Sequence, residues 1–445
     1  MILFTPGPTE PLSRVSAAGG TPVVVTKFDT LRHESSHRWP MFLPDGNHFL
    51  YSTLTASGTA SDNDVVVLAS LDSSVSKVLM LGTTNLCYAG GQLLFIRQGT
   101  LMAQPFDPVK LELTGDAVPV AERVIYSPNY AHAAFSVSEN GVLILQTGEN
   151  QTTHAVVFDE AGNRTHVMTD ANPSGPRFSP DGKRVLFGVL DPLTRNADVW
   201  VNDMTRGAST RLTFNSFIEI NPIWSPGGDS VVYQSNRNGF YDLYIKSANG
   251  AGEDRPLVTS ARNKAAAEWS PDGRYFGYTS TGDPKTKSDI WLLPMTGDRT
   301  PIPFLHTEFN ELSPTFSPDG RWVVYQTDET GKSEIYARLT DGTGGKYKIT
   351  TDGGRRPLWR SDKRKLYFTS MDKKLQIAYL NVTPTSISVD SITTRWDLDA
   401  RNIAGNVLSD VSADGKQFIF PVTDSKLSAP PITLVQNWDE DLKKR

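Results

Sequence analysis

One turn motif recurs along the chain and restricts the folds available to it. The motif is an aromatic or apolar residue followed by Ser-Pro-Asp-Gly, as at Trp269-Ser270-Pro271-Asp272-Gly273. The clearer copies occupy residues 43–46, 178–182, 224–228, 269–273 and 316–320, and weaker copies occupy 88–91, 137–141, 359–364 and 411–415. Successive copies end 41 to 51 residues apart. This period is typical of propeller blades built from four strands.

Each copy has the chemistry of a tight hairpin turn. Proline presets φ, the aspartate carboxylate accepts nearby backbone N–H groups, and glycine adopts positive φ as the next strand begins. The repeated carboxylates are therefore predicted to be structural turn residues rather than acid-base catalysts. They are Asp45, Asp181, Asp272, Asp319 and Asp414.

The residues around each turn have the pattern of β-strands. A short run rich in β-branched and aromatic residues follows the turn, as in Trp322-Val323-Val324-Tyr325. A later strand begins with an acid that is expected to accept hydrogen bonds within or between blades, at Asp198, Asp242, Asp289 and Glu334. The aromatic residues before the turns are expected to pack between blades, at Trp224, Trp269, Phe316 and Trp359. With no helical periodicity between them, four strands per period predict an all-β fold, a β-propeller of eight or nine four-stranded antiparallel blades.

Two divisions of the chain fit this repeat. The favoured one is a single β-propeller over residues 1–445, in which the two terminal segments share one blade and so cover both exposed strand edges. The alternative is a partial propeller unit at 1–171 followed by a six-bladed propeller at 172–445.

Composition excludes several classes of partner. The net charge of −5 and the pI near 5.9 do not favour nucleic acid or anionic lipid, which require clustered Lys and Arg. The single cysteine, Cys87, excludes an internal disulfide framework and a cysteine-based zinc site. The first residues do not read as a secretory signal, and no window approaches 18 apolar residues. We expect a monomer without membrane contact from this chain.

The same motifs resemble those of known families. The stretch from Gly175 to Thr350 is similar to the WD-repeat-like propeller units of TolB and the tricorn protease. Residues 36–40, 99–107 and 134–141 resemble the propeller region on the C-terminal side of bacterial receptor-like serine/threonine kinases. That resemblance implies a cytoplasmic kinase, one membrane span and an extracytoplasmic, periplasmic-side propeller that serves as sensor or docking platform. His-Arg-Asp and Asp-Phe-Gly do not occur here, so this chain is not expected to phosphorylate a substrate.

Catalytic and metal-binding patterns are weak. His33, Glu34 and His37 form the one cluster with metal-ligand chemistry, but the stretch leads into a strand at Pro40 instead of the helix that would bring both rings together. A polar loop is favoured, and no metal or cofactor is predicted. The chain also lacks the Gly-x-Ser-x-Gly elbow of serine hydrolases.

The loops that enter the innermost strands are the preferred ligand-binding face. Such loops gather around the channel of a propeller, and binding residues concentrate on loops held by a rigid scaffold. The candidate ligand or partner residues are Glu219, Asn221, Glu268, Glu311, Arg355 and Arg356. The last two begin a basic run that continues with Arg360, Lys363, Arg364 and Lys365, for which solvated turn positions are favoured over an anion site.

Two functions fit these sequence features. The favoured one is a non-catalytic binding or sensor propeller, the region of a bacterial signalling protein that docks a protein or a small ligand. The alternative is a propeller enzyme, a glycosidase or lyase acting at the channel mouth, which would require convergent carboxylates there.

Overall fold

The computed structural model describes residues 1–7, 10–32, 34–55, 64–72, 76–82, 84–127, 131–148, 152–190, 196–360, 362–406, 409–423 and 431–440. These residues form β-strands and two short 3-10 helices, η1 (Asp399–Arg401) and η2 (Ala404–Asn406). The predicted all-β fold with four-stranded antiparallel sheets is confirmed. No helix among these residues is both long enough and apolar enough to cross a membrane.

The chain divides into two compact units. The first comprises residues 1–151 with 426–445, and the second comprises residues 152–425. Both the single ring over 1–445 and the division into 1–171 and 172–445 stay predictions, as does the number of blades.

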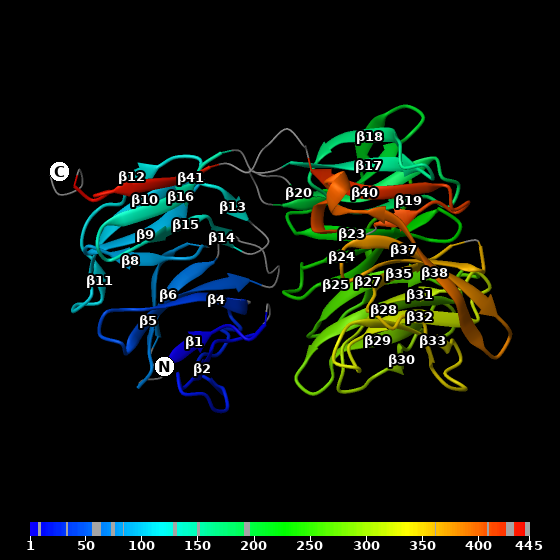
Figure 1. The fold of residues 1–445 in the computed structure, drawn as a ribbon, viewed down its shortest axis with the longest axis horizontal. Helices are drawn as coiled ribbons and strands as arrows, with labels where there is room; N and C mark the ends of the chain where they lie inside the picture. The colour runs from blue at the N-terminus through cyan, green and yellow to red at the C-terminus, as the bar shows by residue number, and fades with distance from the viewer. Residues whose placement is uncertain are drawn as a thin grey trace. The chain divides into compact units, whose positions relative to one another are not determined.

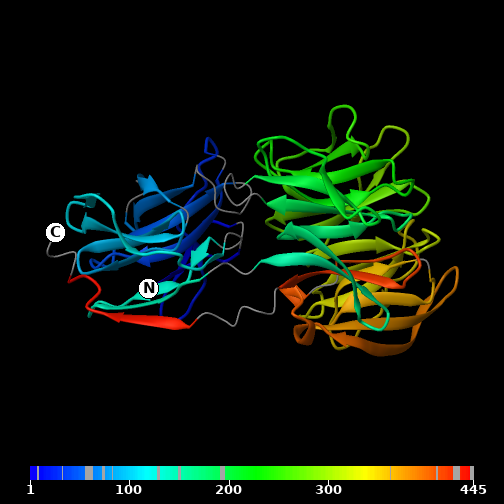
Figure 2. The same cartoon turned by 90° about the horizontal axis from the view of Figure 1, so that it is seen from above.

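The described residues of the first unit form one four-stranded sheet, one five-stranded sheet and several smaller ones. The four-stranded sheet is β4 (Glu34–Phe42), β5 (His48–Thr55), β6 (Val65–Ser70) and β7 (Ser76–Leu81). The five-stranded sheet is β8 (Cys87–Ala89), β9 (Gln92–Arg97), β10 (Thr100–Asp107), β11 (Glu112–Leu113) and β12 (Val118–Ala121). Smaller sheets are formed by β1 (Ile2–Phe4), β2 (Ser13–Val15) and β3 (Val23–Val24), and by β13 (Tyr126–Ser127) with β14 (His132–Ala133). In a further sheet, β15 (Phe135–Val137) pairs with β16 (Val142–Gln146), which pairs with β41 (Ile432–Gln436) from the other end of the chain. Figures 1 and 2 show β41 in red beside β16.

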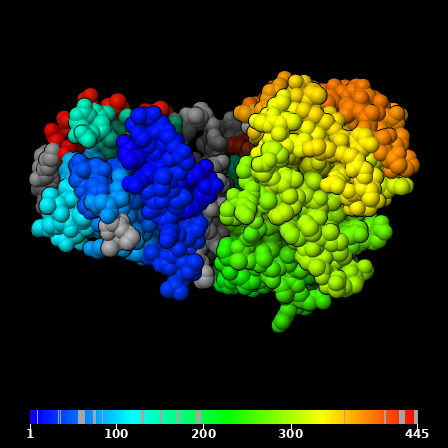
Figure 3. All heavy atoms as spheres, turned by 90° about the horizontal axis from the view of Figure 1, so that it is seen from below, coloured from blue at the N-terminus to red at the C-terminus, as the bar shows by residue number. Residues whose placement is uncertain are grey.

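The second unit contains six four-stranded sheets within the described ranges. Five follow chain order from the inner strand outward: β19 (Pro173–Phe178), β20 (Arg184–Leu190), β21 (Ala197–Asp203) and β22 (Ala208–Arg211); β23 (Glu219–Trp224), β24 (Ser230–Ser235), β25 (Asp242–Ser247) and β26 (Arg255–Val258); β27 (Asn263–Trp269), β28 (Tyr275–Asp283), β29 (Lys287–Pro294) and β30 (Ile302–Leu305); β31 (Glu311–Phe316), β32 (Trp322–Thr327), β33 (Glu334–Leu339) and β34 (Tyr347–Lys348); β35 (Arg355–Trp359), β36 (Lys365–Thr369), β37 (Lys374–Val382) and β38 (Ile387–Asp397). On the face shown in Figure 3, the colours of this unit pass from green through yellow to orange, because successive sheets lie side by side in sequence order.

The sixth sheet joins two distant segments of this unit. β17 (Thr153–Asp159) pairs with β18 (Arg164–Ala171) on one side and with β40 (Gln417–Thr423) on the other, and β40 pairs with β39 (Asp410–Val411). The β17–β40 register runs from Thr153 opposite Thr423 to Asp159 opposite Gln417. β17 and β40 lie next to each other at the top of this unit in Figure 1. Antiparallel pairing of segments that are distant in sequence closes the unit without leaving an open sheet edge between them.

The hydrophobic core shows that the six sheets form a closed ring. Each of six buried clusters takes side chains from two successive sheets, and one of them joins the β35 sheet to the β39–β40 sheet through residues such as Tyr367, Trp396 and Phe418. Another joins the β17–β40 sheet to the β19 sheet through Val157 and Phe187. Apolar burial between blades is therefore continuous around the ring.

The repeated turns have one geometry. In the turn after β27, the Ser270 hydroxyl donates to Asp272 Oδ1 at 2.7 Å, the Arg274 N–H donates to the same carboxylate at 3.0 Å, and Gly273 adopts a φ of 71°. The turns containing Asp181, Asp319 and Asp414 repeat these serine and backbone contacts, and Asp45 accepts the N–H groups of Asn47 and His48. Each of these carboxylates is used locally to define a turn.

Three of the four aromatic residues before the turns are buried. Trp224, Phe316 and Trp359 are 6%, 2% and 2% exposed and belong to clusters between sheets. Trp269 is half-buried and packs edge-on against Phe276, with ring centroids 5.4 Å apart. The expected packing is therefore less complete at Trp269 than at the other three positions.

Candidate functional site

The inner strands of the six-sheet ring surround a cavity of about 280 Å³. Every inner strand or the turn that follows it contributes to the lining. Representative residues, one from each sheet, are Arg177, Trp224, Glu268, Phe316, Arg360 and Asp410. The cavity is the place where the ring brings together residues as far apart in sequence as Arg177 and Ala413, which are separated by 236 positions.

Charged side chains cross this cavity. The guanidinium of Arg360 forms ion pairs with Glu268 and Asp410, and its Nε–H donates to the Val411 carbonyl at 3.1 Å. Glu268 also accepts a hydrogen bond from the Thr315 hydroxyl. Arg360 therefore connects sheets that are not neighbours in sequence order.

Asp410 is held from two sides. Its Oδ2 accepts the backbone N–H of Phe178 at 2.9 Å, and its Oδ1 lies 3.7 Å from Nη1 of Arg177 as well as against Arg360. One carboxylate thus faces two guanidinium groups.

The two arginines respond differently to this environment. Burial disfavours the charged form of Arg360, but Asp410 and Glu268 more than compensate and raise its pKa above the ordinary value. Burial lowers the pKa of Arg177, Asp410 offsets only part of the shift, and the positive charge of Arg360 lowers it further. Arg177 is therefore a charged group with incomplete compensation.

A second set of residues forms bulges halfway along four inner strands. Gly175, Asn221, Ser313 and Arg356 have φ of 54°, 50°, 52° and 48°, at the points where the pairing register shifts. Each precedes a proline: Pro176, Pro222, Pro314 and Pro357. Proline is tolerated at these positions because the inner strands are edge strands of their sheets. The bulges also redirect the side chains that follow them.

Glycine is required at the first of these bulges. Its left-handed φ already disfavours other residues, and a Cβ on Gly175 would lie 2.8 Å from Oδ1 of Asn221 on the next inner strand. The bulges of neighbouring strands therefore approach one another closely.

The six candidate residues predicted from the sequence lie at different positions along the inner strands: at the start, at the bulge or at the turn end. Glu219, Glu311 and Arg355 begin their strands, and they pair with the equivalent positions Ser235, Thr327 and Thr369 of the second strands. In β27 the matching position, paired with Ser280, is Lys264. Asn221 and Arg356 form bulges, whereas Glu268 lies at the turn end of β27, next to Trp269. Only Glu268 of the six lines the cavity.

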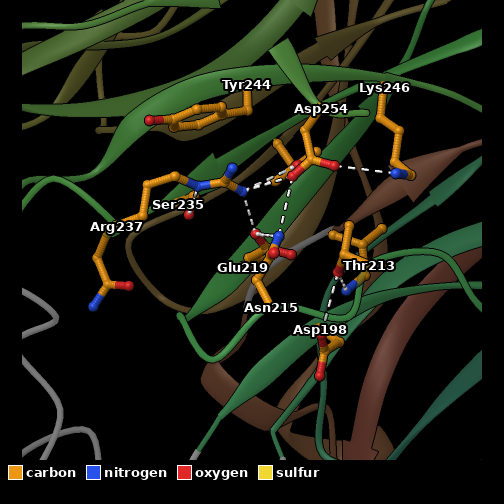
Figure 4. A network of polar contacts seen from close by, with 12 residues as sticks. Asp198, Thr213, Asn215, Glu219, Ser235, Arg237, Tyr244, Lys246 and Asp254 are labelled. Atoms are coloured by element: carbon orange, nitrogen blue, oxygen red, sulfur yellow. Dashed lines mark hydrogen bonds and ion pairs between the residues drawn. The ribbon is translucent and has the colours of Figure 1, made fainter. Parts of the chain in front are cut away.

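Glu219 is enclosed in a polar network (Figure 4). It is fully buried and lies 2.5 Å from Nη2 of Arg237, which also contacts Asp254 at 2.8 Å. The guanidinium lies over the ring of Tyr244, with 3.9 Å to its centroid, and Lys246 pairs with the other side of Asp254 at 3.0 Å. This network fastens loops to strands and leaves Glu219 inaccessible.

The two glutamates that begin inner strands are both desolvated. Burial raises the pKa of Glu219 despite hydrogen bonds from Thr213 and Asn215 and the charge of Arg237. Burial also raises the pKa of Glu311, whose carboxylate accepts a hydrogen bond from Thr307.

The other candidate residues outside the cavity differ in exposure. The side-chain amide of Asn221 donates to Gln234 Oε1 at 2.7 Å. In contrast, Arg355 and Arg356 are exposed.

The acids at or near the start of the third strands are buried and bonded. Asp198 pairs with Arg211 at 2.6 Å, Asp242 with Lys264 at 2.7 Å, and Asp289 with His306 at 3.1 Å. Glu334 accepts hydrogen bonds from Thr350 and from the backbone N–H of Gly353. These contacts within and between blades are those expected from the sequence.

His37 is held by polar contacts within the first unit. Nε2 of His37 lies 3.1 Å from Glu34 Oε2, and Nδ1 lies 2.8 Å from the Thr26 hydroxyl. His33 lies outside the described residues. Among those the structure describes, no group of three or more His, Cys, Asp and Glu residues is arranged to hold a metal ion.

The basic run separates into two groups. Arg360 reaches into the cavity, whereas Lys363, Arg364 and Lys365 form ion pairs with Asp319, Asp390 and Asp362 at 3.2, 3.5 and 3.5 Å. Ser361, in the same turn, is outside the described part of the chain.

Three of the charged cavity residues were not expected from the sequence. Arg177 and Asp410 are absent from the predicted binding residues, and the solvated turn predicted for Arg360 is wrong. A signal was present in the repeat. Arg177, Glu268 and Asp410 each immediately precede the residue that begins the turn motif, and Arg360 replaces the serine of the motif. Two positions of the repeat are usually apolar or small: the residue before the motif and the serine within it. A charged residue at either position indicates that its side chain lines the cavity.

Comparison with known proteins agrees with the ring geometry. Residues 147–342 match the family model of the TolB beta propeller domain. The matched stretch covers the first three sheets of the ring that residues 152–425 form, three strands of its fourth sheet and part of its sixth sheet. The match includes the strands that supply Arg177 and Glu268, whereas Arg360 and Asp410 lie beyond it.

Three curated proteins are similar to part of the chain. An uncharacterized protein of Agrobacterium fabrum is 29% identical over 173 residues, which are 38% of this chain and 55% of that protein. The Tol-Pal system protein TolB of Francisella tularensis subsp. mediasiatica is 25% identical over 192 residues, 42% and 43% of the two chains. An uncharacterized peptidase of Bacillus subtilis is 27% identical over 201 residues, 35% and 30% of the two. The chain thus spans about a third to a half of the length of these relatives.

A solved structure of putative TolB from Agrobacterium tumefaciens is also similar. It is 18% identical, with a TM-score of 0.49, and the similarity covers 62% of this chain and 99% of that one.

Proposed function

We propose that the TolB-like ring is a non-catalytic docking module that binds a protein segment or small ligand at its central cavity and at the adjoining exposed arginines. The observation that carries the proposal is the cavity itself, because all six inner strands or their turns supply its wall. Ligand sites of propellers and other rings form where several elements converge and a few charged groups lie among apolar ones. The similarity to the Tol-Pal system protein TolB supports a binding or scaffold role.

Arg355 and Arg356 form the accessible part of this site. Both are exposed at the start of β35, and neither guanidinium has a hydrogen bond or ion pair among the described residues. Exposed cations of this kind select acidic partners and accelerate their association. The proposal therefore includes these two residues together with the cavity.

A screen for binding tests the proposal. The purified chain is offered a displayed peptide library and a panel of small carboxylates, and each binder is tested again with a variant carrying Arg355→Glu and Arg356→Glu. A matched control carries Lys363→Glu and Arg364→Glu, which makes the same charge change in an exposed turn. Loss of binding in the first variant alone supports the proposal, whereas equal binding by both variants contradicts it.

The kinase-linked origin is a narrower form of the same proposal. The N-terminal resemblance implies that such a docking ring would be the extracytoplasmic sensor of a bacterial signalling protein. Sequencing of the complete coding region tests it, since an upstream kinase and membrane span are expected, and a reading frame without a kinase would contradict this narrower proposal.

A second function is favoured by one observation. Glu268 and Asp410 converge on the cavity, and paired carboxylates are the chemistry of glycosidases. However, both contact the same guanidinium, so a substrate would have to displace Arg360 to reach them. The purified chain is assayed for turnover of glycosides, polyuronates and peptides. If it shows turnover and the Glu268→Gln variant does not, the ring is an enzyme and the docking proposal is wrong.

A further inference from the structure

The last strand of the first unit, β41, has an open edge. Within the described residues β41 pairs with β16 only, so the sheet of β15, β16 and β41 ends at it (Figures 1 and 2). The Asn437 N–H donates to the Gly141 carbonyl on the β16 side, and the direction of the backbone groups alternates along a strand. The backbone groups of Ile432 and Leu434 therefore point to the open edge, and no described residue forms a hydrogen bond with them there.

Nothing in the sequence of β41 protects this edge. Strands at the outer edges of sheets ordinarily contain a charged residue or a proline, which prevents pairing with another chain. β41 is Ile-Thr-Leu-Val-Gln and has neither. The outer strand of each sheet of the ring, and β7 in the first unit, has at least one such residue: Arg164, Arg211, Pro256, Pro303, Lys348, Asp390 and Lys77. β41 is therefore a strand that another strand can extend.

The sheet also exposes apolar side chains beside that edge. Leu143 and Val435 face the core of the first unit, whereas Ile432 and Leu434 lie on the opposite face and are 69% and 60% exposed. Ile144, which is paired with Leu434, is exposed on the same face. Three apolar side chains gathered at an unpaired edge mark an interaction site.

β41 is complementary to a second copy of itself. When two copies pair antiparallel around Thr433, this residue lies opposite its own counterpart, and Ile432 of each copy lies opposite Leu434 of the other. The backbone groups that point to the open edge, those of Ile432 and Leu434, then exchange hydrogen bonds. Threonine pairs across strands are favourable, and the apolar face continues from one copy into the other.

Charge also favours a second copy in this orientation. β15, β16 and β41 contain no charged residue, so the paired sheets bring no like charges together and offer no charge that selects an acidic or basic partner. Asp439 and Glu440 follow β41. Antiparallel pairing places these acids at opposite ends of the joined strands, whereas parallel pairing would place them side by side, where they repel.

We infer that two copies of this chain associate through β41, so that their three-stranded sheets join into one antiparallel sheet with a two-fold axis at Thr433. An interface of one strand and three apolar side chains per chain is smaller than the roughly 800 Å² per partner of a standard complex. Association is therefore weak and reversible, with a Kd of about 10 μM. The sequence alone led us to expect a monomer. The inference goes beyond the docking function, because β41 lies outside residues 152–425.

Sedimentation velocity of the complete chain between about 1 and 200 μM tests the inference. We expect the sedimentation coefficient to rise from that of a monomer to that of a dimer within this range. Leu434→Lys places a charge at the open edge and should raise the Kd at least about tenfold, and it should fold because the side chain is exposed. The matched control is Leu81→Lys, at the 70% exposed end of β7, which should dimerise like the parent.

Cysteine cross-linking tests the register. In a chain with Cys87→Ala, Thr433→Cys places the two new thiols of a dimer opposite each other, with Cα atoms about 4.5 Å apart and within reach of a disulfide. Gln436→Cys places the two Cα atoms about 20 Å apart, because each lies three residues from the two-fold axis. Oxidised glutathione should therefore convert Thr433→Cys into a covalent dimer, whereas Gln436→Cys should stay monomeric on a denaturing gel.

Three outcomes overturn the inference. A monomer up to about 200 μM would exclude self-association, and the open edge would then be left to a strand of a different protein. Equal dimerisation of Leu434→Lys and Leu81→Lys would place the contact elsewhere on the chain. Equal cross-linking at positions 433 and 436 would exclude the proposed pairing. None of these outcomes affects the docking proposal, which is tested at Arg355 and Arg356.

Discussion

Arg360 and Glu268 form an ion pair although they belong to sheets that are separated in the chain by the complete β31 sheet. Such a pair is possible because the inner strands of a closed ring approach one another around its centre. The side chains are 17% and 20% exposed, so the pair is largely removed from water. The ring thereby joins residues 92 positions apart into one charged wall.

Removal of Arg360 should destabilise the ring. Arg360→Ala leaves Glu268 and Asp410 as uncompensated carboxylates, and we expect a loss of about 3–5 kcal/mol in the free energy of unfolding. Lys363→Ala, three residues later in an exposed ion pair, should change it by less than about 1 kcal/mol. Denaturant unfolding measures both. Equal effects of the two variants would show that the cavity pairs do not stabilise the ring.

The turn after β23 allows a matched test of glycine. Gly228 has a φ of 69°, whereas its neighbour Gly227 is not in the left-handed region, and a Cβ at either position would make only ordinary contacts. Gly228→Ala should therefore cost about 1–2 kcal/mol through backbone strain, while Gly227→Ala should be neutral or slightly stabilising. The difference in thermal unfolding midpoint is the readout. Stability that is equal in the two variants would contradict the strain argument.

The aromatic positions should differ in their contribution to stability. Trp359 is 2% exposed in the cluster between the β31 and β35 sheets, and Trp359→Ala should reduce the free energy of unfolding by about 3–5 kcal/mol. Trp269 is half-buried, so Trp269→Ala should cost less. Chemical denaturation of both variants tests the order, and a larger loss for Trp269 would reverse it.

Asp254 should make stability depend on acid pH. Burial would raise its pKa, but hydrogen bonds from Tyr233, Arg237 and Lys246 hold it well below the usual 3.8. A carboxylate with a lowered pKa in the folded state stabilises the fold above its unfolded pKa, and that contribution is lost as pH falls through the folded value.

The comparison of Asp254 with an uncharged residue isolates this effect. The stability difference between the parent and Asp254→Asn should be largest near pH 7 and should shrink below about pH 4. Thermal unfolding of both proteins over this range measures it. A difference that does not vary with pH would mean that the charge of Asp254 contributes nothing.

The all-β fold was predictable because its signals are local. Preset φ, a carboxylate acceptor and a positive-φ glycine lie within four consecutive residues, as at Pro271, Asp272 and Gly273, and the turn forms wherever that sequence occurs. The bulges of the inner strands had a local signal too, since each bulge residue, such as Asn221 and Arg356, stands directly before a proline. The meaning of that signal became clear only from the strand register.

The cavity could not be predicted in the same way. Arg360 is near Arg364 in sequence, yet one crosses the ring and the other remains in an exposed turn. Glu219 and Glu268 were grouped as inner-strand acids, but their positions differ along the strand, so one is enclosed by Arg237 and the other lines the cavity. These differences arise from closure of the ring, to which distant strands contribute.

Hydrogen exchange tests the central claim most directly. The chain is saturated with a peptide selected in the binding screen. The exchange rates of the chain's backbone amides are then compared with those of the chain without peptide. Binding at the cavity predicts slower exchange in the inner strands and their turns, above all in β19, β27 and β35. Slower exchange confined to outer strands such as β22, β26 and β30, or to the first unit, would contradict a binding site at the centre of the ring.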